Sequence, residues 1–395
     1  MKMRWVVWMA LAVAASGCGS NHVRNTLAPD ATVTTGALRA SRASAEGEAQ
    51  HLTGDVGAGT SYSLARPANW NGDLVVYVHG YSNPSGPVAL PNIAPIEQGL
   101  MERGYAVAYS SFSENGYAVA EAVRQTHQLR GLFASRIGQP RRTFLIGVSL
   151  GGIIGLQLAE KFPRDYDGAL LVSGVVGGSG AEVKYIGDVR VLFDAFYPGM
   201  LAGGVTDPPA GVPFNPGPLV ASIQAAPQNL GPILCMTSLP YINGTEAVTS
   251  LLNALGFQWQ GGADLLDRTH GHQLYDNTGV RYQCDALPAT VLDLLNERVA
   301  RYQSTPDARA FLDHYYEPDG KLEIPLLTLH TTRDPVVPVF HEDLYRDKVA
   351  SAGRSQFLLQ RRVARYGHVN FSPAEIVAAF LDLSNWVETG QKPAV

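Results

Sequence analysis

TFLIGVSLGG, the stretch from Thr143 to Gly152, decides the fold of this chain. An apolar run typical of a β-strand leads into a Gly-x-Ser-x-Gly pattern, and an amphipathic run follows from Ile153. This order predicts a strand that turns sharply into a helix, with Ser149 at the turn. Glycine on either side of the serine relieves the crowded backbone, and the helix N-terminus favours developing negative charge. We therefore predict that Ser149 is a nucleophile; the alternative is a Gly-rich turn without chemistry.

Strand and helix patterns alternate around this stretch. The run from Asp73 to Tyr81 is almost entirely apolar, which indicates a strand buried on both faces of a parallel sheet. Further strands are predicted at 61–65, 105–109 and 168–174, and helices at 93–103, 117–137 and 153–162. Strands that alternate with helices of this length predict an α/β fold with a mostly parallel central sheet.

The alternation stops between Val175 and Gly320. Strand signals are scarce there, and helical patterns, clearest at 248–255 and 287–302, lie between segments rich in Pro and Gly. A segment of this length is too long for an ordinary loop, so we predict an inserted, mainly helical cap.

The α/β pattern returns at Lys321. Strands are predicted at 322–330 and 356–360, and helices from Phe340 and from Ser372. The resulting division is an α/β core over 50–174 and 321–392, with the cap over 175–320.

Candidates for the base and the acid that a catalytic serine needs lie after the last two predicted strands. A serine hydroxyl needs a base to take its proton, and the base needs a partner that fixes its tautomer. His368 lies in a Gly-containing loop after the last strand and is the candidate base. Asp334, in the turn after the strand before it, is the candidate acid. The alternatives are a surface histidine and an aspartate that caps a turn.

The N-terminal sequence has the pattern of a targeting segment. Lys2 and Arg4 precede an apolar run too short to span a bilayer, and small residues then lead to Cys18. This resembles a bacterial lipoprotein signal, with residues 1–17 as the signal peptide and Cys18 lipidated. Residues 18–49 are rich in Ala, Ser, Thr and Gly, with little hydrophobic periodicity, and would be a flexible tether. The alternative is an ordinary secretory signal cleaved after a small residue near 14; either route exports the protein.

Export changes how the other cysteines are interpreted. If Cys18 is lipidated, Cys235 and Cys284 remain as a pair in an oxidising compartment, and we predict one disulfide between them. Two separately buried thiols are the alternative.

Composition argues against several other functions. The net charge of −5, without a basic stripe, gives no support to nucleic-acid binding. His270 and His272, with Asp264 and Asp267, lack a further ligand pattern, so no metal site is expected. Glu114 and Asn115 are weak candidates for substrate contact. The aromatic residues of the cap are also candidates, although core packing of the cap would explain them equally well: Phe257, Trp259, Tyr275 and Tyr282.

Four motifs, taken in chain order, resemble those of the serine α/β-hydrolase superfamily. They are VHGY at 78–81, GVSLG at 147–151, RDPVVP at 333–338 and YGH at 366–368. The resemblance implies an α/β-hydrolase fold, a triad of Ser149, Asp334 and His368, and an oxyanion hole made by the backbone N–H groups of Tyr81 and Leu150.

The activity that this resemblance implies is hydrolysis of a carboxylic ester through an acyl-enzyme, without a cofactor. A peptidase of the same superfamily, acting on short peptides, would use the same residues. A non-catalytic binding lipoprotein on this scaffold is a third hypothesis, against which the intact Ser, Asp and His set argues.

Overall fold

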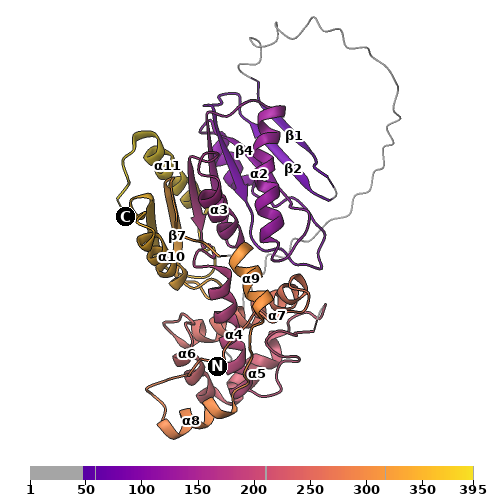
Figure 1. The fold of residues 1–395 in the computed structure, drawn as a ribbon, viewed down its shortest axis with the longest axis vertical. Coiled ribbons are helices and arrows are strands. Elements are labelled where there is room, and N and C mark those ends of the chain that lie inside the picture. Colours follow the sequence, from indigo (N-terminus) through magenta and orange to yellow (C-terminus); the bar gives the residue numbers. More distant parts are fainter. Residues whose placement is uncertain (1–47, 58, 210, 316, 395) are drawn as a thin grey trace, which may run out of the picture. The chain divides into compact units, whose positions relative to one another are not determined.

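A twisted sheet of eight strands forms the centre of the described part of the chain in the computed structural model (Figure 1). The structure describes residues 48–57, 59–209, 211–315 and 317–394. The predicted signal peptide, Cys18 and all of the tether except its last two residues lie outside these ranges. The strands are β1 Gln50–Asp55, β2 Ser61–Arg66, β3 Asp73–Val78, β4 Ala106–Ser110, β5 Arg142–Val148, β6 Gly168–Val172, β7 Leu326–Arg333 and β8 Leu358–Tyr366.

The strand order is β1-β2-β4-β3-β5-β6-β7-β8. β1 pairs with β2, and β2 with β4, in antiparallel fashion, whereas every later pair is parallel. The carboxyl ends of β3 to β8 therefore meet at one edge of the sheet, which is where parallel sheets gather functional loops. This mostly parallel sheet flanked by helices is the fold that the sequence predicts.

Helices cover both faces of the sheet, as Figure 1 shows for α2 and α3 on one side and α11 on the other. Alternate residues of the central strands feed two separate apolar cores. Leu74 and Leu145 point into the core shared with α2 and α3, whereas Val75 and Phe144 point into the core shared with α1 and α11. The helices of the α/β core are α1 Ala94–Met101, α2 Val119–Arg136, α3 Leu150–Lys161, α10 Phe340–Ser351 and α11 Pro373–Thr389.

The last helix begins with a complete capping box. Ser372 accepts a hydrogen bond from the Glu375 N–H, and the Glu375 carboxylate accepts from the Ser372 N–H in return. Pro373 occupies the first turn, where its missing N–H costs nothing. This fixes the start of α11 five residues after His368.

Six α-helices lie between β6 and β7 in the described residues, and we call this segment the cap. They are α4 Ser179–Phe196, α5 Pro216–Ala225, α6 Leu230–Met236, α7 Gly244–Arg268, α8 Ala289–Arg298 and α9 Pro306–Tyr315. A disulfide joins Cys235, in α6, to Cys284, in the segment before α8, with the two Cα atoms 5.6 Å apart. The pairing is the one that the sequence predicts.

Several elements differ from the prediction. The edge strand β1 (QHLTGD) is half exposed and polar, so it lacks the apolar alternation that identifies strands. The predicted helix at 248–255 covers only part of the N-terminal half of α7, which has 25 residues. β8 extends to Tyr366 through the charged sequence RRVAR because it lies at the sheet edge. No helix among the described residues has both the length and the apolar character needed to cross a bilayer.

Candidate active site

Ser149 sits in a strained turn between β5 and α3. Its φ of 56° and ψ of −121° are unusual for a residue with a side chain. A Cβ on Gly147 would lie 2.2 Å from the Gly151 carbonyl oxygen, and one on Gly151 would lie 2.0 Å from the Val78 oxygen. Glycine is therefore required at both positions. The Ser149 N–H donates to the Val172 oxygen of β6 (2.9 Å), which ties the turn to the sheet.

His368 bridges the serine and the aspartate. Its Nε2 lies 2.8 Å from Ser149 Oγ, and its Nδ1 lies 2.7 Å from Asp334 Oδ2. Because a carboxylate only accepts hydrogen bonds, Nδ1 carries the proton and a neutral ring leaves Nε2 free to accept from the serine hydroxyl. The structure thus brings together the three residues that the sequence selects, with the imidazole between the serine hydroxyl and the carboxylate, where a general base has to lie.

Asp334 is fully buried and held as a carboxylate. Its Oδ1 accepts from the N–H groups of Val336 (2.9 Å) and Val337 (3.0 Å). Burial alone would raise the pKa of Asp334, but the attraction and hydrogen bond of His368, with the charge of His330 and the Val337 N–H, outweigh it and lower the pKa.

The loop that carries His368 is fastened to the end of β7. The Gly367 N–H donates to the Arg333 oxygen (2.9 Å), and Thr331 Oγ1 donates to the Gly367 oxygen (2.7 Å). The side chain of His368 is 21% exposed, so the base is reached from solvent on one side only. These contacts anchor the loop of His368 to the end of β7, the strand that Asp334 directly follows.

The loop after β3 lies directly against Ser149. A Cβ on Gly80 would be 3.0 Å from Ser149 Cβ and 3.4 Å from its Oγ. His79 donates from Nδ1 to the Gly80 oxygen (2.8 Å) and stacks on Phe112. Burial lowers the pKa of His79, so its ring is neutral. Tyr81, one of the two predicted oxyanion donors, thus follows a glycine in contact with the serine.

The second predicted donor, Leu150, is the first residue of α3. N–H groups in the first turn of a helix have no carbonyl partner within that helix. The Leu150 N–H is therefore free of helix bonding and directly follows Ser149, as an oxyanion donor must be.

Helix α7 of the cap crosses the edge of the sheet that carries the site. Near its start, Glu246 pairs with Arg333 at the end of β7 (3.0 Å), and Ser250 hydrogen-bonds Tyr366 (3.2 Å). In its middle, the Gln260 oxygen accepts from the Tyr81 hydroxyl (3.2 Å). The helix therefore contacts the loops next to the acid, the base and the oxyanion loop.

The end of α7 contacts the loop after β4. Asp264 accepts from the Tyr117 N–H (2.6 Å), and Arg268 pairs with Glu114 (3.1 Å) and donates to the Asn115 oxygen (2.7 Å). Glu114 and Asn115, proposed above as weak candidates for substrate contact, fasten the cap in this structure. Asp264, considered above as a metal ligand, is likewise engaged with Tyr117 and Arg268.

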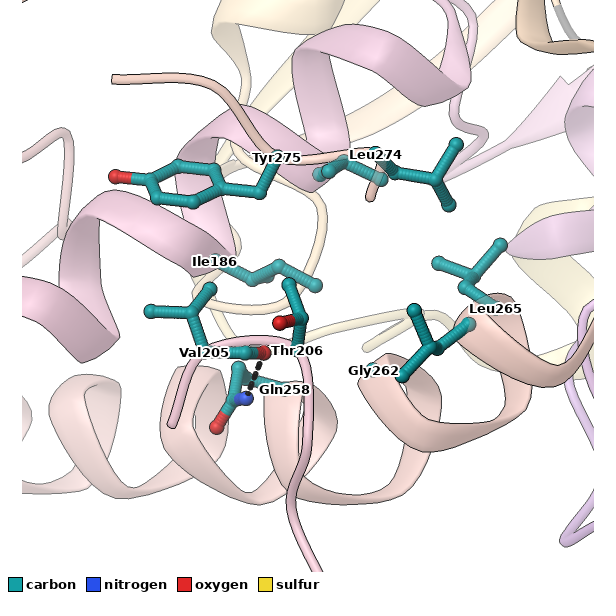
Figure 2. A pocket seen from close by; sticks show the side chains of 10 residues that line it. Ile186, Val205, Thr206, Gln258, Gly262, Leu265, Leu274 and Tyr275 are labelled. Atoms are coloured by element: carbon teal, nitrogen blue, oxygen red, sulfur yellow. Dashed lines mark hydrogen bonds between the residues drawn. The ribbon is translucent and has the colours of Figure 1, made fainter. Parts of the chain in front are cut away.

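An apolar recess lies inside the cap between α4 and α7 (Figure 2). Its empty volume is about 340 Å³. Gln258 spans its floor and donates to the Val205 oxygen (2.7 Å). The other lining residues are Val183, Ile186, Thr206, Gly262, Leu265, Leu266, Leu274 and Tyr275.

The four cap aromatics singled out above have different surroundings. Tyr275 lines the recess, whereas Phe257 packs edge-on against Tyr81 at 5.6 Å between ring centroids. Trp259 donates to the Val212 oxygen (2.7 Å), and Tyr282 donates to Asp188 (2.9 Å). Phe257 is therefore the aromatic that reaches the oxyanion loop.

Four buried ionisable residues near Asp334 escape sequence reasoning. They are His330 in β7, His341 and Glu342 in α10, and Glu182 in α4. Each stands inside an apolar or helical pattern, and their mutual contacts span up to 159 residues of sequence. His330 and Glu342, 12 residues apart, gave no local signal of their pairing.

The chain is similar to known hydrolases in sequence and in fold. No protein-family model matches it. It is 23% identical over 408 residues to an o-phthalyl amidase from Xanthobacter agilis, covering 86% of this chain and 88% of that protein. Its fold is similar to that of an esterase from Aspergillus oryzae, with a TM-score of 0.51 and 15% identity over 87% of this chain and 80% of the other.

An acylaminoacyl peptidase from Pyrococcus horikoshii is also similar, with a TM-score of 0.44 and 10% identity over 88% of this chain and 42% of that one. The chain therefore spans less than half the length of that peptidase. With the strand order above, the likeness to the esterase shows that the fold is an α/β-hydrolase fold, as the sequence predicts.

Proposed function

We propose that this chain is a serine hydrolase that cleaves carboxylic esters through an acyl-enzyme. The observation that carries the proposal is the position of His368, between Ser149 Oγ at 2.8 Å and the buried Asp334 at 2.7 Å. A strained serine, a neutral imidazole and an ionised aspartate in this order are what acyl transfer requires.

The first half of the reaction acylates the serine. Ser149 Oγ attacks the substrate carbonyl carbon while His368 Nε2 takes the hydroxyl proton. The resulting oxyanion faces the N–H groups of Tyr81 and Leu150, each such donor being worth about 3–4 kcal/mol in the transition state. The intermediate collapses, and the leaving alcohol departs with the proton that His368 returns.

The second half frees the enzyme. His368 takes a proton from water, whose oxygen attacks the acyl carbon, and a second oxyanion forms at the same donors. Collapse releases the carboxylic acid and returns the proton to Ser149 Oγ. The groups that this scheme uses are the three side chains, the two backbone N–H groups and water.

Amide cleavage is the second candidate activity. The observation that favours it is the similarity in sequence to an o-phthalyl amidase over most of both chains. The same residues would act, with His368 protonating the leaving amine. Cleavage of short peptides is a third candidate, on the same machinery.

The test is a panel of aryl and acyl esters, aryl amides and peptide anilides, assayed with the wild-type protein and with Ser149→Ala. We expect ester turnover to fall at least about 10⁴-fold in the variant, with the melting temperature within a few degrees of wild type. A fluorophosphonate probe should label the wild type and not the variant. Near-normal ester turnover in Ser149→Ala, or an unlabelled wild-type protein, contradicts the proposal, and the latter result is the one expected of a non-catalytic binding protein.

We further propose that the protein is exported and anchored to a membrane, facing the periplasm or the cell surface, by a lipid on Cys18. The disulfide between Cys235 and Cys284 supports an oxidising compartment. In Cys18→Ala, the protein should move from the membrane fraction to the soluble exported fraction. Retention of that variant in the membrane argues against the lipid anchor.

A further inference from the structure

A second histidine, His330, lies beside the acid of the candidate triad. It belongs to β7, four residues before Asp334, and its side chain is completely buried. Its Nε2 lies 2.8 Å from the Val337 oxygen and 3.6 Å from Asp334 Oδ2, and its Nδ1 lies 3.1 Å from Glu342 Oε1. Asp334 Oδ2 therefore has an imidazole on each side, His368 at 2.7 Å and His330 at 3.6 Å.

Both ring nitrogens of His330 face atoms that only accept. The Val337 carbonyl has no proton to give, and Glu342 accepts from Thr328 through its other oxygen, as a carboxylate does. Beside an ionised Glu342, a neutral imidazole would leave one of these contacts as two opposed acceptors, which is costly in a dry interior. Burial lowers the pKa of His330, but Glu342, Asp334 and the Val337 oxygen together outweigh burial and raise it.

The other buried pair of this cluster, Glu182 and His341, differs from the pair of His330 and Glu342 in its charge. His341 accepts the Gly177 N–H at Nδ1 (3.1 Å), so its proton is on Nε2, which donates to Glu182 (2.9 Å). Burial lowers the pKa of His341 to about 3, and burial with the charge of Asp334 raises the pKa of Glu182. Both are therefore uncharged at neutral pH.

The remaining groups that face this cluster bring no second cation to Asp334. Tyr185, whose hydroxyl donates to the Pro335 oxygen, has a pKa raised by burial, as has Tyr366. Glu317, which faces His341, is paired with Lys348 (3.1 Å). Among the described residues that contact Asp334, His330 is thus the imidazole whose pKa is raised toward the charged form.

We propose that His330 is a positioning residue, a buried imidazolium held by Glu342 and Val337 that keeps Asp334 ionised and directed at His368. The proposal rests on the proposed function, because it assigns His330 to the acid of that site. The cation also repels any further positive charge that is brought to the other side of Asp334, where His368 lies 2.7 Å from Oδ2.

The kinetic test replaces buried histidines by glutamine and follows kcat/KM against pH. In His330→Gln, the carboxylates of Glu342 and Asp334 are left without their cation, so protonation of the site becomes easier. We expect the acidic limb of the profile to move up by about one pH unit, with KM little changed. The double variant His330→Gln/Glu342→Gln removes both charges, and its limb should return toward the wild-type position.

His341→Gln is the matched control. This histidine is equally buried and lies in the same cluster, but it is neutral, and glutamine can still donate to Glu182. Its acidic limb should stay at the wild-type pH. An unmoved limb in His330→Gln, or an equal shift in His341→Gln, overturns the proposal, because a purely structural role predicts a similar effect of both substitutions.

A spectroscopic measurement decides the matter even where the His330 variant does not fold. In the Ser149→Ala protein labelled with ¹⁵N-histidine, we expect one imidazole with both nitrogens protonated at pH 7.5, where a histidine with the ordinary pKa of about 6.5 is mostly neutral. Glu342→Gln should abolish that signal. Ten histidines that all show a neutral ring at pH 7.5 would overturn the proposal. This measurement needs no turnover, so it separates a failure here from a failure of the proposed hydrolase activity.

Discussion

Single residues in this site are fixed by contacts that allow little substitution. Gly80 is the clearest case, because its Cα faces Ser149 while its neighbour Tyr81 is a predicted oxyanion donor. A Cβ at this position would meet Ser149 Cβ at 3.0 Å and the Val148 oxygen at 3.2 Å. Both neighbours belong to the rigid turn at the end of β5, so the loop after β3 has to move instead.

Gly80→Ala should therefore separate the oxyanion loop from the serine by a few tenths of an ångström. We expect kcat to fall by about 10–100-fold, because oxyanion donors act only in the transition state, with KM changed much less. Steady-state kinetics on a good ester substrate measure both constants. Gly131→Ala is the control, since a Cβ there would meet nothing within 4 Å. A wild-type kcat in Gly80→Ala would show that the loop is not held against Ser149.

At the scale of elements, the sequence predicts those whose pattern is local. β3 and β5 were predictable because strands buried on both faces are continuous apolar runs. The three candidate triad residues were predictable because each follows such a strand or its neighbour: Ser149, Asp334 and His368. The helix α4 was not, because it contains two glycines near its start and middle and buries the ionisable side chains of Glu182 and Arg190. Partners brought by tertiary structure, such as Glu342 for His330, leave no local pattern.

The start of α11 makes a pH-dependent contribution that can be measured. Hydrogen bonds from Arg365 and then Ser372 lower the pKa of Glu375 to about 2. A depressed folded pKa stabilises the fold above the ordinary value of 4.5, and this contribution is lost as the pH falls toward 2. Since the carboxylate is partly exposed, solvent screening keeps the effect small.

Glu375→Gln should thus lower the melting temperature at pH 7 by about 1–2 °C, and the difference from wild type should shrink between pH 5 and pH 3. Thermal unfolding followed by circular dichroism across that range measures it. Lys392→Gln, close to the opposite end of the same helix, is a control for loss of a surface charge. A difference that stays constant down to pH 3 would mean that the capping carboxylate is not the cause.

At the scale of the whole molecule, the cap and the α/β core contribute different residues to the candidate site. Ser149, Asp334 and His368 follow β5, β7 and β8, so the core alone places the reacting groups. The cap contributes α7, which contacts the loops beside the acid, the base and the oxyanion loop through Glu246, Ser250 and Gln260. If the chain is the hydrolase proposed above, we expect its substrate selection to depend on how firmly the cap holds α7, and the disulfide is a covalent tie within the cap.

Removing that tie should loosen the cap. The bond between Cys235 and Cys284 closes a sequence separation of 49 residues around α7, and a loop of this length corresponds to about 4 kcal/mol of lost chain entropy in the unfolded state. We expect the double variant Cys235→Ser/Cys284→Ser to melt about 4–8 °C below wild type. Calorimetry measures the shift, and wild-type protein treated with a reductant should move in the same direction.

The same variant tests the division between cap and core. Because the reacting groups depend on the core, the variant should keep its labelling by a fluorophosphonate probe at 25 °C, while its preference among ester substrates changes as α7 becomes less firmly held. An unchanged melting temperature would mean that packing alone fixes the cap. Loss of probe labelling in a folded variant would instead show that the cap helps to place Ser149 or His368. In the described residues, the contacts that hold these two side chains come from the α/β core.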